Sequence, residues 1–229
     1  MKTINPLLLS DGYKLSHRPQ YPEGTTLVYS NWTPRGSRIK EIDKGVLFGM
    51  QYFTKAYLID SFNSEFFAKP KEEVCGEYKA LIEEYLGGSY DITHIEALHD
   101  LGYLPLEIKA LPEGSLVPMR VPMFTIKNTH PDFFWLVNFL ETLISNVIWQ
   151  PCTSATLALR YRKLLSDWAE KTGGNPEIFA GCTVVDIQAH DFSMRGMGSI
   201  ESSLTSGMGH AVVFKGGDNL TVMHGLNKY

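Results

Sequence analysis

The alternation of apolar and polar residues between positions 182 and 219 is the most informative pattern in the chain. An apolar run containing Val184, Val185 and Ile187 precedes a segment of small residues, and a second apolar run covers 211–214. We predict a strand, a helix and a strand here, the βαβ pattern of a parallel α/β sheet. Ligands of such sheets bind at the carboxyl ends of the strands.

Chemically distinctive side chains follow these two runs. Phe192 and Arg195 come after the first run, and Asp218 comes after the second. A ring, a permanent cation and a carboxylate at one rim suit a flat polar ring joined to a phosphorylated group. A second interpretation stays open at this point, in which Asp191 pairs with Arg195 at helical spacing and Phe192 belongs to the core.

Similar patterns predict the elements in the rest of the chain. We expect strands over 26–32 and within 104–127, where prolines favour the edge strands of a small antiparallel sheet. We expect these helices: 46–62 with Gly49 inside it, one opened by Pro70 and stopped by Gly87, an apolar one over 133–149, one capped by Thr153 or Ser154 and ending at Gly173, and one beginning near Asn219.

The predicted fold class is therefore α/β, in two domains. Residues 1–111 form a mixed α+β domain, and residues 112–229 hold antiparallel strands, buried helices and the βαβ part. A parallel sheet needs further strands and helices to cover both faces. We therefore expect the chain to be part of something larger.

Composition narrows the function. The 229 residues carry a net charge of −4, which argues against nucleic acid as the main partner. The cluster of Arg35, Arg38 and Lys40 is too short for a nucleic-acid arm. We expect no membrane partner either, since the N-terminus lacks a signal peptide and polar residues interrupt the apolar segment 133–149.

Three cysteines are present, an odd number at wide spacing (Cys75, Cys152 and Cys182). They suggest neither a disulfide framework nor a metal site, and we expect a reducing, cytoplasmic location.

Several motifs together resemble one family. They are SDGYKLSH (10–17), LVYSNWTPR (27–35), LFGMQY (47–52), LPLEIKALPEG (104–114), WLVNFLET (135–142), HDFSMRG (190–196) and VFKGGD (213–218). In this order and at these intervals they resemble the N-terminal half of nicotinamide phosphoribosyltransferase. The resemblance implies that residues 112–229 belong to an irregular α/β barrel of the type II phosphoribosyltransferase kind, which is incomplete in this chain.

The resemblance also implies an activity and roles for five residues. The family converts nicotinamide and phosphoribosyl pyrophosphate to nicotinamide mononucleotide and pyrophosphate, in homodimers with sites at the subunit interface. Phe192 and, from the partner subunit, Tyr13 would stack on the two faces of nicotinamide, and Asp218 would lie beside its carboxamide. Arg195 and, from the partner subunit, Arg35 would contact phosphate or diphosphate.

Cofactors follow from the same resemblance. Mg²⁺ is expected with phosphoribosyl pyrophosphate, and ATP in the intact family enzyme, whose phosphorylatable histidine lies beyond Tyr229. No catalytic residue and no protein metal ligand is assigned here.

Two alternative functions stay open. They are a nicotinate phosphoribosyltransferase, against which Asp218 argues, and a non-catalytic fragment that binds nicotinamide or regulates a longer subunit. A truncated or split form is the expected state of this chain.

The chain departs from the family at the loop after Phe192. Ser193 stands where the family commonly has Gly, and a positive φ there would strain a serine. Met194 follows where an aromatic residue is common. Among the histidines, we expect His190 to be a structural hydrogen-bonding residue. Surface or turn positions are expected for the rest (His17, His94, His99, His130, His210 and His224).

Overall fold

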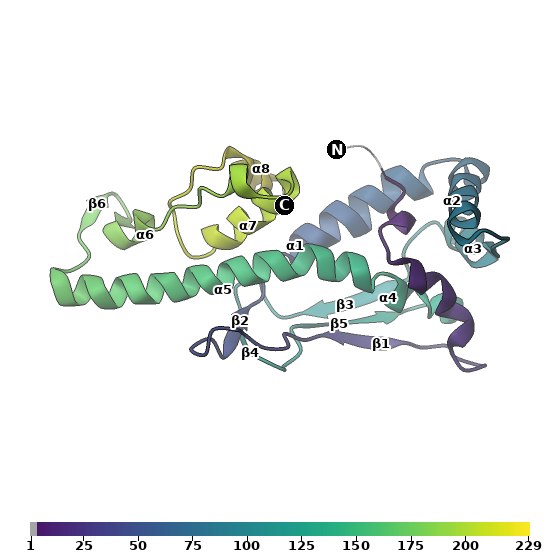
Figure 1. The fold of residues 1–229 in the computed structure, drawn as a ribbon, viewed down its shortest axis with the longest axis horizontal. Helices are drawn as coiled ribbons and strands as arrows, with labels where there is room; N and C mark the ends of the chain where they lie inside the picture. The colour runs from purple at the N-terminus through teal and green to yellow at the C-terminus, as the bar shows by residue number, and fades with distance from the viewer. Residues whose placement is uncertain (1–3) are drawn as a thin grey trace. The chain divides into compact units, whose positions relative to one another are not determined.

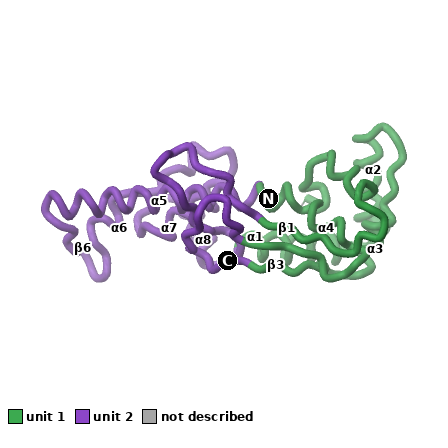
Figure 2. Tube along the Cα trace, turned by 90° about the horizontal axis from the view of Figure 1, so that it is seen from below, with its two compact units in different colours: residues 1–31, 52–109, 124–145 green, residues 32–51, 110–123, 146–229 purple. Residues whose placement is uncertain are grey.

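The computed structural model describes residues 4–229 and divides the chain into two compact units (Figure 2). Unit 1 comprises the described residues up to 31 together with 52–109 and 124–145. Unit 2 comprises 32–51, 110–123 and 146–229. The domains predicted at 1–111 and 112–229 stay a prediction, and residues 1–3 of the first lie outside the described part.

Unit 1 is built mainly from short helices. They are η1 (Pro6–Leu8), η2 (Gly12–Ser16), η3 (Arg18–Gln20), the end of α1 (Met50–Phe53), the wide π-type turns η4 (Thr54–Ser61) and η5 (Asn63–Phe67), α2 (Lys71–Leu86), α3 (Thr93–Leu101), η6 (Pro131–Phe133) and α4 (Leu136–Phe139). The prediction for α2 is confirmed. Pro70 precedes it, Glu72 and Glu73 lie in its first turn, and Gly87 ends it in the left-handed conformation (φ 69°).

The prediction for residues 46–62 is only partly right. Val46 ends β2, and the helix begins at Met50. Gly49 has a φ of 105°, so it lies in the turn before the helix and not inside it.

The core of unit 1 is aromatic. Phe62, Phe66 and Tyr78 are wholly buried, and the rings of Phe62 and Phe66 meet edge to face with centroids 6.4 Å apart. Because each aromatic side chain removes a large apolar area from water, this core stabilises the unit mainly by burial.

Three small sheets are present among the described residues. One has the order β1-β5-β3 (Tyr29–Trp32, Phe124–Asn128, Leu106–Ala110). In the second, β2 (Lys44–Val46) pairs antiparallel with β4 (Leu116–Pro118); in the third, β6 (Glu177–Phe179) pairs antiparallel with β7 (Cys182–Thr183). The single sheet predicted within 104–127 is therefore divided. Pro118 ends β4, which pairs with β2 and not with β3 or β5.

Helix α5 runs from Glu141 to Thr172 without interruption (Figure 1). The prediction of a separate helix capped by Thr153 or Ser154 is wrong. Pro151 lies inside the helix, and the Thr153 hydroxyl donates to the Trp149 carbonyl oxygen at 2.8 Å, as an interior threonine does. The predicted end of this helix before Gly173 is confirmed.

The remaining elements of unit 2 are α6 (Val184–Gln188), η7 (Met194–Gly196), α7 (Ile200–Ala211) and α8 (Leu220–Lys228). The predicted strand at 184–187 is wrong: Thr183 and Asp186 form a capping box, which begins a helix there. The predicted strand at 211–214 is also wrong, since Ala211 ends α7. The helix of small residues and the helix after Asn219 are confirmed as α7 and α8.

Candidate substrate-binding site

The site begins with the close packing of α7 against α5 in unit 2, visible in Figure 1. The hydroxyls of Ser154 and Ser206 are 2.8 Å apart, and the Ser202 hydroxyl donates to Gln150 Oε1 at 2.6 Å. A Cβ at Gly209 would lie 2.6 Å from the backbone oxygen of Pro151, closer than atoms can approach. Small residues are therefore required on this face of α7.

A charged pair fixes α6 to α5. The Arg162 guanidinium donates to Asp186 Oδ1 at 2.6 Å, while Asp186 Oδ2 accepts from the Thr183 N–H at 2.8 Å. The Thr183 hydrogen bond and then the Arg162 guanidinium hold the pKa of Asp186 well below its usual range. The Asp186 backbone oxygen accepts from the Lys215 N–H at 2.8 Å, so this pair also fixes the start of the segment that carries Asp218.

Two segments of the chain, 189–193 and 216–219, lie side by side after these elements. Asp191 and Gly217 form an isolated parallel bridge, and the Asp218 N–H donates to the Asp191 carbonyl oxygen at 2.9 Å. The Asp191 carboxylate accepts from the buried Asn219 amide at 2.6 Å and from the Ser193 N–H at 3.2 Å. The two chain segments were predicted to pair in parallel as strands at 184–187 and 211–214. They pair in parallel only at this one bridge, a few residues after each predicted strand.

Phe192 projects from the first segment and is 59% exposed, which excludes the interpretation that it belongs to the core. The Arg195 guanidinium lies 4.8 Å from the centre of its ring, a cation–π contact that holds the two side chains together. Ser193 has a φ of −85°, an ordinary conformation for serine. The departure from glycine at this position therefore causes no backbone strain.

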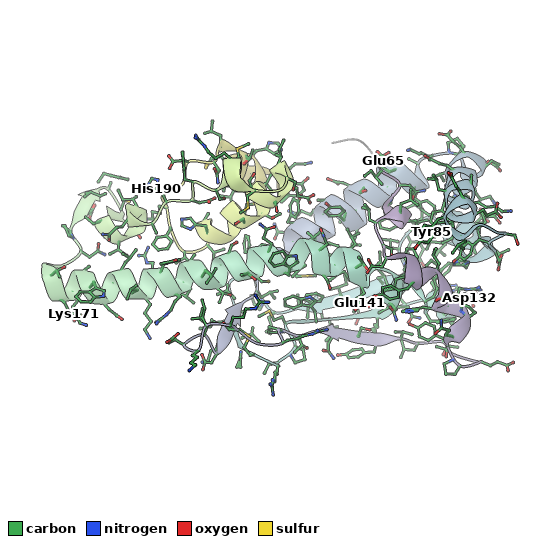
Figure 3. The ribbon with its side chains drawn as sticks, in the orientation of Figure 1. Glu65, Tyr85, Asp132, Glu141, Lys171 and His190 are labelled. Carbon is green, nitrogen blue, oxygen red and sulfur yellow. The ribbon has the colours of Figure 1, made fainter. Side chains whose placement is uncertain are left out.

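Asp218 projects from the second segment, with its carboxylate exposed. The His190 ring (labelled in Figure 3) reaches it, with Nδ1 3.1 Å from Oδ2. His190 thus makes the hydrogen bond predicted for it, with Asp218, and its structural role stays a prediction. Phe192, Arg195 and Asp218 are thus carried by two segments that are hydrogen-bonded to each other.

Tyr13 lies in unit 1, on η2, and is 56% exposed. The residues on either side of Tyr13 in the motif attach η2 to other parts of unit 1. The buried Lys14 binds Asn138 and Glu141, whose side chain is labelled at the start of α5 in Figure 3. Asp11 accepts from the Thr142 hydroxyl at 2.7 Å. These hydrogen bonds and the ion pair hold η2 in place. The Tyr13 ring stays exposed, and its centroid lies 5.1 Å from the centroid of the His17 ring.

Arg35 lies in the loop after β1, at a hollow of about 420 Å³ in unit 2. Arg38, Trp32 and Trp149 line the same hollow, whose described lining residues include no aspartate or glutamate. The hollow therefore carries positive charge, as a phosphate contact requires.

Sequence reasoning missed several residues that build the site. Arg162, Asp186 and Asn219 hold it together, and the spacing of Thr183 and Asp186 was a readable helix-start signal. Three histidines predicted at surface or turn positions are elsewhere. His94 is buried in α3, and His99 is half-buried in the same helix with a hydrogen bond to the Lys69 carbonyl. His210 lies in α7 with hydrogen bonds to two backbone carbonyls. Only the folded chain shows these partners.

Within residues 4–229, no three His, Cys, Asp or Glu side chains form a group that could hold a metal ion. No helix of the described chain has the length and apolar character needed to cross a membrane.

Comparison with solved structures identifies the class of fold. The human nicotinic acid phosphoribosyltransferase superposes with a TM-score of 0.61 at 18% identity, covering 93% of this chain and 36% of that one. A nicotinate-nucleotide pyrophosphorylase from Pyrococcus furiosus superposes with a TM-score of 0.54 at 16% identity, covering 93% and 38%. The fold is that of the type II phosphoribosyltransferases, an α/β fold.

Sequence comparison shows which proteins the chain is similar to. Residues 5–108 match the family described as nicotinamide phosphoribosyltransferase, N-terminal domain. A nicotinamide phosphoribosyltransferase of Acinetobacter baylyi is 48% identical over 99% of this chain and 45% of its own length. One from Xanthomonas campestris pv. campestris is 32% identical over 96% and 43%. This chain is therefore similar to nicotinamide phosphoribosyltransferases, with residues 5–108 matching their N-terminal domain, and it spans about half the length of these relatives.

Proposed function

We propose that this chain supplies the base-binding part of a nicotinamide phosphoribosyltransferase. The reaction joins the pyridine nitrogen of nicotinamide to C1 of the ribose, while the C1–O bond breaks and its electrons leave with pyrophosphate. One structural observation carries the proposal: an exposed ring, Phe192, and an exposed carboxylate, Asp218, project from two segments that are hydrogen-bonded together. The similarity to proteins of that name supports it.

In this proposal each residue has a physical role. The Phe192 ring stacks on the pyridine, which contributes on the order of 1 kcal/mol beyond area burial. The Asp218 carboxylate accepts a hydrogen bond from the carboxamide N–H₂. Arg195 offsets negative charge at the phosphate end of the substrates, and positioning and charge neutralisation lower the barrier as positive charge develops on the ribose. We assign no covalent nucleophile.

Selectivity for the amide follows from Asp218. The carboxylate of nicotinic acid would be repelled by the carboxylate of Asp218, and like charges without solvent cost several kcal/mol. The nearest alternative is a nicotinate phosphoribosyltransferase, which the human structural neighbour's name suggests. That neighbour supports only the fold, and Asp218 favours nicotinamide.

The test is a comparison of kcat/KM for nicotinamide and nicotinic acid, measured on the intact protein before and after Asp218→Asn. We expect the wild type to prefer nicotinamide, and Asp218→Asn to reduce that preference at least about tenfold by removing the repulsion. Asp167→Asn, at an exposed aspartate of α5, is the matched control and should leave it unchanged. Preference for nicotinic acid by the wild type would refute the proposal.

We propose further that the protein is a homodimer in which Tyr13 and Arg35 complete the partner's site. Two observations support this: the Tyr13 ring is exposed on an anchored turn, and Arg35 lies at a positively charged hollow. Mixing Tyr13→Ala with Phe192→Ala subunits tests it. In an equimolar mixture about half of the dimers are heterodimers, and each heterodimer contains one intact site and one doubly substituted site. About a quarter of wild-type activity should therefore return from two nearly inactive variants. If each site is built from one subunit, no activity returns.

Location and cofactors complete the proposal. A cytoplasmic location is supported by the three cysteines, which are all free and buried. Mg²⁺ would enter bound to phosphoribosyl pyrophosphate, and ATP would act on the complete enzyme; neither is assigned a binding residue in this chain.

A further inference from the structure

His210 occupies a central position that neither the motifs nor the proposed reaction explains. It lies in the last turn of α7, half-buried, and its ring stacks on the buried Phe214 with centroids 5.0 Å apart and an angle of 21° between the planes. The Arg162 guanidinium lies 5.8 Å from the centre of the Phe214 ring. The orientation of the His210 ring is therefore fixed by packing.

One ring nitrogen of His210 meets two backbone oxygens. Nε2 lies 3.1 Å from the carbonyl oxygen of Ala189 and 3.1 Å from that of Gly216. A carbonyl oxygen can only accept, so Nε2 must carry the hydrogen and share it between both oxygens. The geometry thus places a hydrogen on Nε2.

The two carbonyls belong to the two segments of the candidate site. Ala189 comes three residues before Phe192, and Gly216 comes two residues before Asp218. The junction is tight, because a Cβ at Gly216 would collide with the ring of His190. His210 therefore joins the first residues of the two segments by hydrogen bonds, at a junction where the backbone is closely packed.

Helix α7 gives His210 a fixed reference. The Ser154–Ser206 and Ser202–Gln150 hydrogen bonds and the close approach at Gly209 seat α7 on α5. Helix α5 thus positions α7, and α7 positions the His210 ring, which is hydrogen-bonded to both segments.

We infer that His210 is a positioning residue that sets the separation of Phe192 from Asp218, and with it the selectivity for a flat ring bearing a carboxamide. The ligand part of this inference rests on the proposed function, whereas the positioning part does not. His210 is assigned no contact with the substrate.

Three variants distinguish the contribution of the Nε2–H hydrogen bonds from that of the stacking on Phe214. His210→Gln keeps an N–H donor at the reach of Nε2 and loses the aromatic stack. His210→Phe keeps the stack and loses the donor, leaving two carbonyls without it, and His210→Ala loses both. His224→Phe, at an exposed histidine of α8, is the matched control for the substitution itself.

The first measurement needs no ligand. Nitrogen-15 NMR of the intact protein at pH 7.5 should show His210 with hydrogen on Nε2, and the Asp218 amide should be protected from hydrogen exchange. We expect exchange at Asp218 to rise about tenfold or more in His210→Phe and His210→Ala, and to stay within about threefold in His210→Gln. An unprotonated Nε2 in the wild type would overturn the inference, even if a variant failed to fold.

The second measurement is the ratio of kcat/KM for nicotinamide to that for nicotinic acid. His210→Phe should lower it about tenfold by raising KM for nicotinamide, with KM for phosphoribosyl pyrophosphate little changed, and His210→Gln should restore it. If the wild type uses neither base, the proposed function fails while the exchange data still decide the role of His210. Unchanged exchange and selectivity in folded His210→Phe would refute that role.

Discussion

The aromatic core of unit 1 and the candidate site of unit 2 are held together by different interactions. Unit 1 buries large aromatic rings such as Phe62, Phe66 and Tyr78, which attract one another in many orientations. Around the candidate site, unit 2 relies on small residues of α7 and on directional hydrogen bonds from Arg162, His210 and Asn219. Burial gives stability, whereas hydrogen bonds fix distances. The residues that would hold a ligand in unit 2 are placed by the second kind of interaction.

The largest expected effect tests the aromatic core. Phe66→Ala removes a wholly buried ring that contacts Phe62, Phe67 and His99, and should lower the free energy of unfolding by about 3–5 kcal/mol. Phe192→Ala removes an exposed ring and should cost less than about 1 kcal/mol of stability, while weakening nicotinamide binding by roughly fivefold or more. Urea denaturation of both variants measures the difference. Similar losses in both would show that Phe192 is structural.

The second effect compares how the units respond to acid. Burial, helped by Arg18 and opposed by Asp91, lowers the pKa of His94 in unit 1 to about 4. The unfolded chain binds a proton near pH 6.5 and the folded chain does not, so stability should fall as pH drops from about 6.5 to 4, on the order of 3 kcal/mol in all. In unit 2 the pKa of Asp186 is lowered, so its contribution is lost only below about pH 4.

Denaturation midpoints between pH 7.5 and 4.5 test this difference. His94→Gln, which has no proton to bind, should flatten the pH dependence in that range. An unchanged slope in the variant would assign the loss to other groups.

The third effect tests the close approach of α7 to α5. Gly209→Ala places a Cβ 2.6 Å from a backbone oxygen of Pro151, which cannot move independently of its helix. We expect a loss of about 1–3 kcal/mol and faster hydrogen exchange at Asp218. Full stability in this variant would contradict the described contact.

The smallest effect has the opposite sign and comes from unit 1. Gly76 lies in the exposed interior of α2, and outside its own helix backbone no described atom comes within 4 Å of the position that a methyl group would take there. Gly76→Ala should therefore raise the free energy of unfolding by about 0.5–1 kcal/mol through helix propensity alone. Thermal unfolding, followed by circular dichroism, measures the shift, and a loss of stability would indicate a contact at this face of α2.

The sequence by itself determined the local elements whose signals are local. Pro70 with Glu72 and Gly87 predicted α2, because caps act over a few residues. The helix at 200–211 followed only from the strand–helix–strand pattern, whose two strands are wrong. The motifs also predicted the similarity to nicotinamide phosphoribosyltransferases, and the strand–helix–strand pattern predicted that Phe192, Arg195 and Asp218 lie together. Their roles stay predictions.

Only the tertiary structure decided which residues hold the site. The apolar run at 184–188 suits a strand or a buried helix equally, and the local capping box of Thr183 and Asp186 favours the helix. The bond from Arg162 that fixes this helix to α5 exists only in the fold. His210 carries no sequence signal of its role, because the two carbonyls that it binds come from positions 189 and 216. Contacts between residues so far apart exist only after the chain has folded, so a single sequence cannot specify them by pattern.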